Sequence, residues 1–209
     1  MSNRGDVNAD KTLADRLAAL SPEKRALLRR RLENDQVSGY ALVAESLHKC
    51  GITHIYGVAG RPSEEILPAC AERSIRPIGA YQQTSAVCMA QAQNYVAGRL
   101  VAAALVSAGP AVTNAITGLH VAHDNAWPLV VLGGKRASFQ NLEARPLMEP
   151  VTKQMTEVVS TAAIPEAVRN ACQLAMSDRP GPVYLDLHED CLQGFARPPV
   201  AECEEHEGL

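Results

Sequence analysis

This chain of 209 residues lacks long apolar runs and a strong excess of either charge. No stretch approaches the roughly 20 consecutive apolar residues of a membrane-spanning helix, and no apolar run follows Met1 as in a secretory signal. The net charge is -3, whereas proteins that bind nucleic acid usually carry a clear basic excess. We therefore expect a cytoplasmic protein that engages neither membranes nor nucleic acid.

Cysteine patterns that would indicate disulfides or metal are also missing. The six cysteines are scattered and form no C-x-x-C pair, so reduced thiols are expected. His120, His123 and Asp124 share one face of a predicted helix, but a lone H-x-x-H-D at a helix end is more typical of capping and interface contacts. We expect no metal site within this chain.

What the chain does contain is an alternation of short apolar runs and helix-length segments. Buried strands are predicted at residues 54–58, 75–80, 101–107, 129–132, 156–160 and 183–187. Helices are predicted at residues 40–47, 63–72, 84–97, 112–124 and 165–177. Ser38 is a candidate N-cap of the first helix, and Gly51 has the position of a terminating glycine. The alternation predicts an α/β fold of three layers, with a mainly parallel sheet covered on both faces.

Informative residues follow the predicted strands. Glycine-containing segments come after the first, third and fourth strands, and Tyr81-Gln82-Gln83 comes after the second. Glycine lets the backbone approach a ligand closely, and helix N-termini offer amide dipoles. Any doubly wound domain needs glycine at such turns, so each segment alone carries little weight. Their joint order is more specific, and it places the site outside the carboxyl ends of the strands.

A family resemblance rests on five ordered stretches, which are "GITHIYGVAGRPSEEIL", "SIRPIGAYQQTSAVCMAQAQNYVAGR", "ALVSAGPAVTNAITGLHVAHDNAWPLVVLGG", "FQNLEARPLMEPVTK" and "DRPGPVYLDL". Together they resemble the N-terminal, pyrimidine-binding domain of thiamine-diphosphate enzymes. The likeness is nearest to oxalyl-CoA decarboxylase and 2-hydroxyacyl-CoA lyase, and more distant to acetolactate synthase. It covers residues 36 to about 194, within a predicted domain of residues 36–198.

The resemblance implies that two domain types pair, with thiamine diphosphate bound across the joint. The second type holds the diphosphate through Mg²⁺ and carries a G-D-G segment, which does not occur in these 209 residues. Three explanations are open: a cut at a domain boundary, a naturally split enzyme, or a degenerate domain kept for binding. We expect a split decarboxylase or carboligase that is active only with a partner subunit carrying the diphosphate-binding domain. The alternative is a non-catalytic scaffold or regulatory subunit.

The resemblance also implies the site residues. Gln83 stands where the family usually carries a catalytic glutamate, and Gln82 is the less favoured match. Gln140 is assigned the second catalytic position. Cofactor contacts are assigned to Gly60, Gln83, Gly109, Pro110 and Asn114. Substrate-side positions are assigned to Arg61, Asn125 and Phe139.

Glutamine at position 83 changes the expected chemistry. In the family, the glutamate hydrogen-bonds a pyrimidine ring nitrogen and favours the imino tautomer that removes the thiazolium C2 proton. Glutamine can hydrogen-bond this nitrogen but cannot hold it protonated. A charge-assisted bond of about 1.5–3 kcal/mol is thus replaced by a neutral one of about 1 kcal/mol, which predicts roughly tenfold slower activation. Glu64 and Glu65 are nearby carboxylates, but their position favours contacts with a helix start.

Partner contacts are predicted from two further segments. Leu13, Leu17 and Leu20 recur at helical spacing, and Ser21-Pro22-Glu23 is typical of a helix start. The segment "LAALSPEKRALLRRRL" resembles short segments that precede domains of modular peptide and polyketide synthases, so residues 1–35 are a candidate docking element or a helical hairpin packed on its own domain. Residues 199–209 are predicted to be a flexible tail.

The predicted helix at residues 84–97 is rich in small residues, which are Ala86, Ala90, Ala92 and Ala97. Small side chains permit close approach of another helix. Related enzymes bury the matching face against a second subunit, so the resemblance implies a homodimer or a heterotetramer.

Overall fold

The computed structural model describes residues 21–24, 27 and 36–198. The chain divides into two units, Met1–Gln36 and Val37–Leu209. In the first unit residues 22–24 and 27 are helical, and the backbone N–H of Lys24 donates to Ser21 Oγ at 3.3 Å, as predicted for an N-cap. Leu13, Leu17 and Leu20 lie outside the described residues, as does the tail at 199–209, so the docking role and the flexibility stay predictions.

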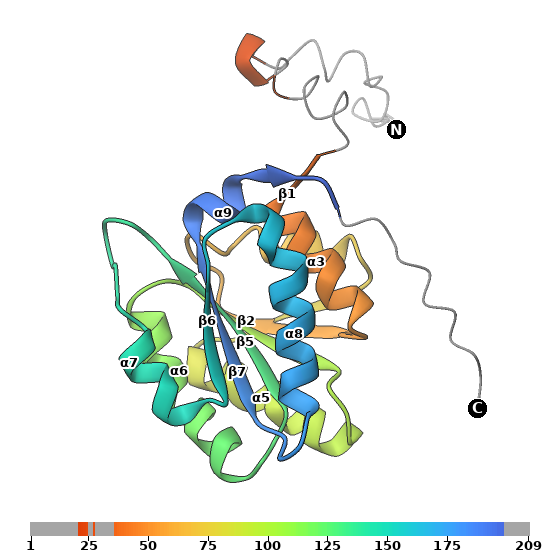
Figure 1. The fold of residues 1–209 in the computed structure, drawn as a ribbon, viewed down its shortest axis with the longest axis vertical. Coiled ribbons are helices and arrows are strands. Elements are labelled where there is room, and N and C mark those ends of the chain that lie inside the picture. Colours follow the sequence, from red (N-terminus) through yellow and green to blue (C-terminus); the bar gives the residue numbers. More distant parts are fainter. Residues whose placement is uncertain (1–20, 25–26, 28–35, 199–209) are drawn as a thin grey trace, which may run out of the picture. The chain divides into compact units, whose positions relative to one another are not determined.

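The second unit is built around a parallel sheet of six strands (Figure 1). In spatial order these strands are β3 (Arg76–Gly79), β2 (His54–Gly57), β4 (Ala102–Val106), β5 (Leu129–Lys135), β7 (Pro182–His188) and β6 (Gln154–Val158). Each neighbouring pair is parallel. The direction of winding reverses between β2 and β4, and open α/β sheets bind ligands at such a switch point. A separate antiparallel pair joins β1 (Val37–Ser38) to β8 (Phe195–Ala196).

Helices cover both faces of the sheet (Figure 1). One face packs against α3 (Gly39–Lys49), α4 (Ile66–Ala71) and α8 (Ile164–Met176). The other packs against α5 (Gln83–Ala97), α6 (Pro110–Asp124) and α7 (Arg145–Met148). A short helix, α9 (Glu189–Gln193), follows β7, and 3₁₀ turns occur at η1 (Glu149–Val151) and η2 (Thr161–Ala163). The predicted three-layer α/β fold is confirmed.

Local signals account for the ends of α3. The backbone N–H of Ala41 donates to Ser38 Oγ at 3.3 Å, so Ser38 is the N-cap. Gly51 follows the C-cap residue Cys50 with φ of 78°, a left-handed conformation that favours glycine. Both predictions from the sequence are confirmed.

The bounds of three predicted elements differ from the structure for identifiable reasons. Strand β5 continues through both glycines to Lys135, because it pairs with β7 as far as His188. Strand β6 begins at Gln154, two residues before the predicted start. It is an edge strand, and edge strands tolerate polar residues, so its first residues do not form the apolar run that predicts a strand. Helix α4 begins at Ile66, because residues 61–65 form turns.

Two of the small residues of helix α5 are buried inside the domain. Ala86 and Ala90 are fully buried, and Ala90 packs in the core shared with α6. Close contact between the helices is visible at Gly118, where a Cβ would lie 2.6 Å from Val87 Cγ1. Ala86 and Ala90 therefore let α5 approach its own sheet and α6, and the homodimer or heterotetramer stays a prediction.

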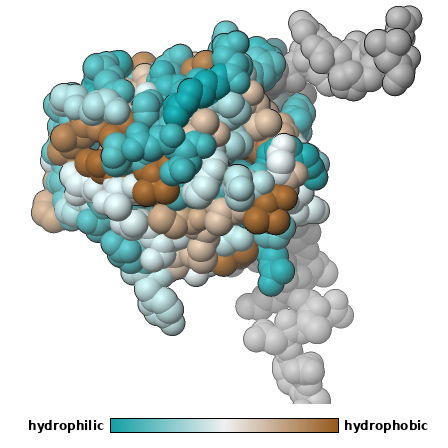
Figure 2. Space-filling model, turned by 90° about the horizontal axis from the view of Figure 1, so that it is seen from below, coloured by the Kyte–Doolittle hydropathy of each residue, from teal (hydrophilic) through white to brown (hydrophobic). Residues whose placement is uncertain are grey.

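Exposed hydrophobic residues lie near the C-terminal ends of three helices. They are Tyr95 and Val96 on α5, Val121 on α6 and Met176 on α8. Figure 2 views the molecule from below and shows separate hydrophobic patches between hydrophilic residues. In the part of the chain with described structure, no helix is long and apolar enough to cross a membrane.

Candidate functional site

The loop after β2 is fastened to the carboxyl end of β4. Ser63 is fully buried, and its Oγ lies 3.2 Å from the carbonyl oxygens of both Gly60 and Val106. A Cβ at Gly60 would lie 2.9 Å from the Ser107 side chain, so only glycine permits this approach without displacement. The first loop therefore lies directly beside the loop that leads into α6.

Two further contacts position this loop. The Tyr40 hydroxyl on α3 donates to the Pro62 carbonyl at 3.2 Å. Burial, together with the nearby Glu64, raises the pKa of Tyr40, which keeps this donor protonated at neutral pH. Arg61 is exposed, and its Nε lies 3.6 Å from Glu64 Oε1, so this carboxylate is paired with Arg61. Tyr40 was not predicted as a site residue, because its partner Pro62 lies far along the chain.

Gln83 forms the first residue of α5 and is held by α6. Asn114 Nδ2 donates to Gln83 Oε1 at 3.1 Å. The Thr84 hydroxyl donates to the backbone carbonyl of Asn114, which ties the same two helices a second time. Gln83 is half-buried, and Asn114 is exposed. Because the amide oxygen of Gln83 faces Asn114, its Nε2 group remains as a donor for a ligand.

The loop after β5 reaches the start of α6. Gly109, the N-cap residue of α6, has φ of 63°, and a Cβ there would lie 2.7 Å from Gln140 Cβ. Glycine is therefore required both by the backbone conformation and by the contact. Pro110 follows as the first helical residue. Phe139 is 68% exposed next to Gln140, so an apolar ring stands at this edge of the sheet.

Eight of the nine predicted site residues thus lie at the carboxyl edge of the sheet, in the loops after β2 and β5 and at the starts of α5 and α6. They are Gly60, Arg61, Gln83, Gly109, Pro110, Phe139 and Gln140, and Asn114 joins them through its bond to Gln83.

The structure does not bring Asn125 to this edge. Asn125 is the C-cap of α6, whose 15 residues separate it from Pro110 by about 22 Å. Its Nδ2 donates to the Val121 carbonyl at 2.8 Å. Asn125 is therefore not grouped with the other predicted site residues, since a turn that precedes a parallel strand lies at the opposite edge from one that follows it, and its substrate-side role stays a prediction.

A polar cluster anchors the loop that carries Phe139 and Gln140. Lys135, at the end of β5, has a largely buried side chain whose Nζ lies 3.5 Å from both Glu143 and Glu157. His188 Nε2 lies 3.5 Å from Glu157 Oε2. Burial alone would raise the pKa of Glu157, but Lys135 and His188 outweigh it and lower the pKa. Glu143 thereby ties the far end of the loop to the sheet.

Beneath this cluster lies Asp186, in the middle of β7 and only 1% exposed. The Tyr184 hydroxyl donates to Asp186 Oδ1 at 3.3 Å, while Oδ2 is buried with no partner among the described residues. Burial raises the pKa of Asp186 to about 6, against the opposing effect of Lys135. The only sequence signal was a lone acidic residue inside an apolar strand.

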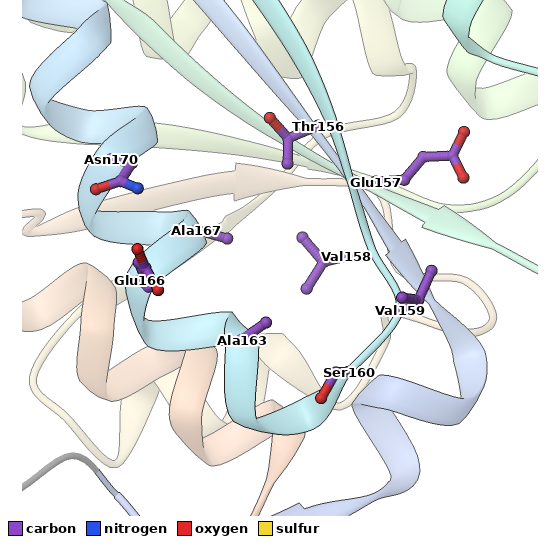
Figure 3. Close-up of a pocket in the computed structure, with 9 residues that line it drawn as sticks. All are labelled: Thr156, Glu157, Val158, Val159, Ser160, Ala163, Glu166, Ala167 and Asn170. Carbon is purple, nitrogen blue, oxygen red and sulfur yellow. The ribbon is translucent and has the colours of Figure 1, made fainter.

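A separate cavity of about 220 Å³ opens between β6 and α8 (Figure 3). Val158, Ala163 and Ala167 point toward one another across it, whereas Glu157 points away. Its walls are mainly apolar, with no pairing of nucleophile and base. Residues 21–24, 27 and 36–198 contain no group of three or more His, Cys, Asp or Glu side chains that could hold a metal ion. Polar side chains of the predicted site, among them Gln83 and Asn114, lie instead at the carboxyl edge.

The chain is similar to several known proteins. Residues 37–162 match the model of the thiamine pyrophosphate enzyme N-terminal TPP binding domain. The catabolic acetolactate synthase of Raoultella terrigena is 32% identical over 79% of this chain and 31% of its own length. The 2-hydroxyacyl-CoA lyase of Arabidopsis thaliana is 32% identical over 75% of this chain and 28% of its own. The acetolactate synthase isozyme 3 large subunit of Escherichia coli is 34% identical over 76% of this chain and 29% of its own length. The chain thus spans less than a third of the length of these relatives.

Proposed function

Because the chain belongs to the thiamine pyrophosphate enzymes through their N-terminal domain, we propose that it supplies the pyrimidine-binding half of a thiamine-diphosphate site. The observation that carries this proposal is the Gln83 amide at the start of α5, oriented by Asn114 Nδ2 at 3.1 Å. Its free Nε2 group is a donor, and an unprotonated pyrimidine ring nitrogen is an acceptor. Gly60 and Gly109 allow close contact with Ser107 and Gln140, which holds the loops after β2 and β5 against the segment that leads into α6.

A second domain would complete the site and hold the diphosphate through Mg²⁺. We propose that a partner subunit carries this domain, in a homodimeric or heterotetrameric assembly. Arg61, Phe139 and Gln140 come from loops at the same edge of the sheet and would face the substrate side of the joint.

The reaction class we propose is decarboxylation of a 2-oxoacid or ligation of an acyl donor to an acceptor. Thiamine diphosphate supplies a carbanion that adds to a carbonyl group. The names of the relatives, acetolactate synthase and 2-hydroxyacyl-CoA lyase, support this class. The role of this chain would be to bind and orient the aminopyrimidine through Gln83 and to shield the reacting carbon with the loop that carries Phe139 and Gln140. We further propose that the N-terminal segment, residues 1–35, docks to a peptide or polyketide synthase module.

A non-catalytic scaffold is the second candidate, favoured by one observation. Gln83 occupies the position of the family's glutamate and has no carboxylate to share a proton with the ring. Co-purification of the chain from its source, followed by a carbon dioxide release assay with thiamine diphosphate, Mg²⁺ and a panel of 2-oxoacids, separates the two. Release that depends on the cofactor supports the enzyme. A stable complex without turnover supports the scaffold.

The isolated chain is expected to bind thiamine diphosphate weakly, with a dissociation constant above about 0.1 mM. Much of the affinity should come from the contact between Mg²⁺ and the diphosphate, which we assign to the partner domain. Titration calorimetry with and without Mg²⁺ measures this, and Mg²⁺ should make little difference. Micromolar binding by this chain alone would refute the shared site.

Substituting Gln83→Glu is expected to accelerate C2-hydrogen exchange of the bound cofactor roughly tenfold in the complete complex, without raising turnover. Glutamate can still accept from Asn114 through one oxygen while the other shares a proton with the ring nitrogen. Turnover should not follow, because a site adapted to a neutral contact is limited at a later step. Exchange is measured by quenching in deuterated buffer and product formation in parallel.

The matched control is Gln82→Glu, which adds a carboxylate one residue away, where the side chain contacts Thr84 and Ser85. It should leave exchange close to the wild-type rate. If Gln83→Glu also leaves exchange unchanged, Gln83 does not face the ring nitrogen and the assignment is wrong.

A further inference from the structure

Two cysteine thiols meet where α3 packs against α8. Cys50 is the C-cap residue of α3, and it packs against the core cluster that contains Cys172, a residue in the third turn of α8. Both thiols are free. Both helices belong to the core layer on the face of the sheet opposite to α5 and α6. This pair is remote in sequence, so its proximity depends on the fold.

The two thiols differ in accessibility. Cys50 is half-buried and lines a cavity of about 130 Å³ together with Arg169 and Lys49. Lys49 is paired with Glu45 at 3.5 Å, which leaves Arg169 as the cation that acts on Cys50. Cys172 is 7% exposed, and it lies about one turn after Arg169 on the same helix, α8. A small oxidant can therefore reach one thiol, and the second is already in place to react with it.

The electrostatics support this order of reaction. The hydrogen bond from Cys172, together with Arg169, lowers the pKa of Cys50 despite its burial. The pKa of Cys172 is raised by the same pairing and by burial. The thiolate is the nucleophile in thiol oxidation, so Cys50 is the thiol that should react first.

We propose that Cys50 and Cys172 form an oxidation site at which a peroxide generates a disulfide between α3 and α8. The Cys50 thiolate attacks one peroxide oxygen, the O–O bond breaks, and hydroxide leaves, which gives a sulfenic acid. Cys172 then attacks the Cys50 sulfur and displaces hydroxide, which takes up the thiol proton as water. The net reaction consumes two thiols and one hydrogen peroxide and yields one disulfide and two waters.

The other described cysteines lack this combination. Cys70 and Cys191 are fully buried, and burial raises the pKa of each to about 12. Cys88 is half-buried on α5, on the other face of the sheet. Cys88 therefore serves as an internal reference for a partly accessible thiol without a positioned partner.

A disulfide here would fix the α3–α8 layer. It closes a long loop, and restricting the unfolded chain in this way typically raises the melting temperature by about 5 °C or more for a domain of this size. The same helix α3 carries Tyr40, whose hydroxyl holds the Pro62 carbonyl in the first loop of the candidate site. Oxidation would thus stiffen the helix that supports this loop.

The test is a hydrogen peroxide titration of the full 209-residue chain, followed by alkylation and peptide mass spectrometry. We expect a cross-linked pair of peptides containing Cys50 and Cys172, formed faster than oxidation of Cys88 and reversed by dithiothreitol, with a higher melting temperature in the oxidised protein. In Cys172→Ser, dimedone should trap a sulfenic acid on Cys50. In Cys88→Ser, the disulfide should form as in the wild type.

Oxidation of Cys50 to sulfinic acid in the wild type without a cross-link would overturn the proposal, as would oxidation of Cys88 before Cys50. These readouts come from the wild-type chain, so they hold even if a serine variant fails to fold. They do not depend on cofactor binding or catalysis, so their failure is distinct from failure of the proposed function.

Discussion

Replacing Asn94 with alanine is expected to lower the free energy of unfolding by about 4 kcal/mol. This side chain is completely buried near the C-terminal end of α5, where Nδ2 donates to the carbonyl oxygens of Ala102 and Pro128, both at 2.9 Å. Its Oδ1 accepts from the backbone N–H groups of Val101 at 2.9 Å and Ala102 at 2.8 Å. Alanine would leave four backbone groups without these partners, at about 1–3 kcal/mol for each one that water cannot reach.

The informative companion is Asn94→Asp, which nearly preserves the shape of the side chain. Its carboxylate can still accept from the two N–H groups, but it faces two carbonyl oxygens with negative charge. We expect strong destabilisation at neutral pH and partial recovery as acid restores a donor. Urea denaturation followed by circular dichroism measures both variants. A loss below about 1 kcal/mol for Asn94→Ala would mean that water replaces the amide.

Asn94 could not be identified from the sequence, although the elements it joins could. Strands such as β4 and β5 are buried on both faces, so their apolar runs are visible in the sequence by themselves. The amide of Asn94, by contrast, satisfies groups before β4 and before β5 at once. That role depends on how α5 packs against the sheet. The sequence around a polar helix residue does not show which distant backbone groups its side chain will bond.

The edge of the sheet that carries the candidate site could be predicted from the sequence, because it follows from strand direction. All strands of a parallel sheet end at the same edge, so loops that follow strands converge whatever the details of packing. Gln83, Gly109 and Gln140 follow three different strands and meet at one edge. Asn125 precedes a strand, and the same rule places it at the other edge.

The polar cluster at Lys135 was not predicted, because its members come from strands that are neighbours only in space. In the sheet, β7 lies between β5 and β6, and β6 is the edge strand. This spatial order, which differs from the order along the chain, brings Lys135, Glu157 and Asp186 together. Register pairs Glu157 with Asp186 across β6 and β7. Two carboxyl groups, those of Glu157 and Asp186, thereby lie near a single lysine. Burial and the negative charge of Glu157 raise the pKa of Asp186, Lys135 opposes them, and the result is a pKa of about 6.

Substituting Asp186→Asn is expected to raise the free energy of unfolding by about 3 kcal/mol at pH 8. Burial disfavours the ionised form of Asp186, and its pKa of about 6 lies roughly two units above that of an exposed aspartate. Each unit corresponds to about 1.4 kcal/mol. Asparagine keeps an oxygen to accept from Tyr184 and replaces the unpartnered Oδ2 with a neutral amide group.

The sign of the pH dependence follows from the direction of the shift. Between about pH 4 and pH 6 the folded protein holds a proton on Asp186 that the unfolded chain has released, so rising pH penalises the folded state. Below about pH 4 both states are protonated, and the substitution should bring no gain. The advantage of Asp186→Asn should grow from pH 4 to pH 6 and remain constant above it.

Urea denaturation of the wild type and Asp186→Asn, at half-unit steps from pH 4 to pH 8, measures this difference. Asp190→Asn is the matched control, because it makes the same chemical change at an exposed position and should alter stability by less than about 0.5 kcal/mol at every pH. A loss of stability in Asp186→Asn at pH 8 would mean that the ionised carboxylate is held favourably by Lys135 and His188. In that case the cluster beneath the Phe139 loop would stabilise the folded domain through its charges, and the cost assigned to burial would be wrong.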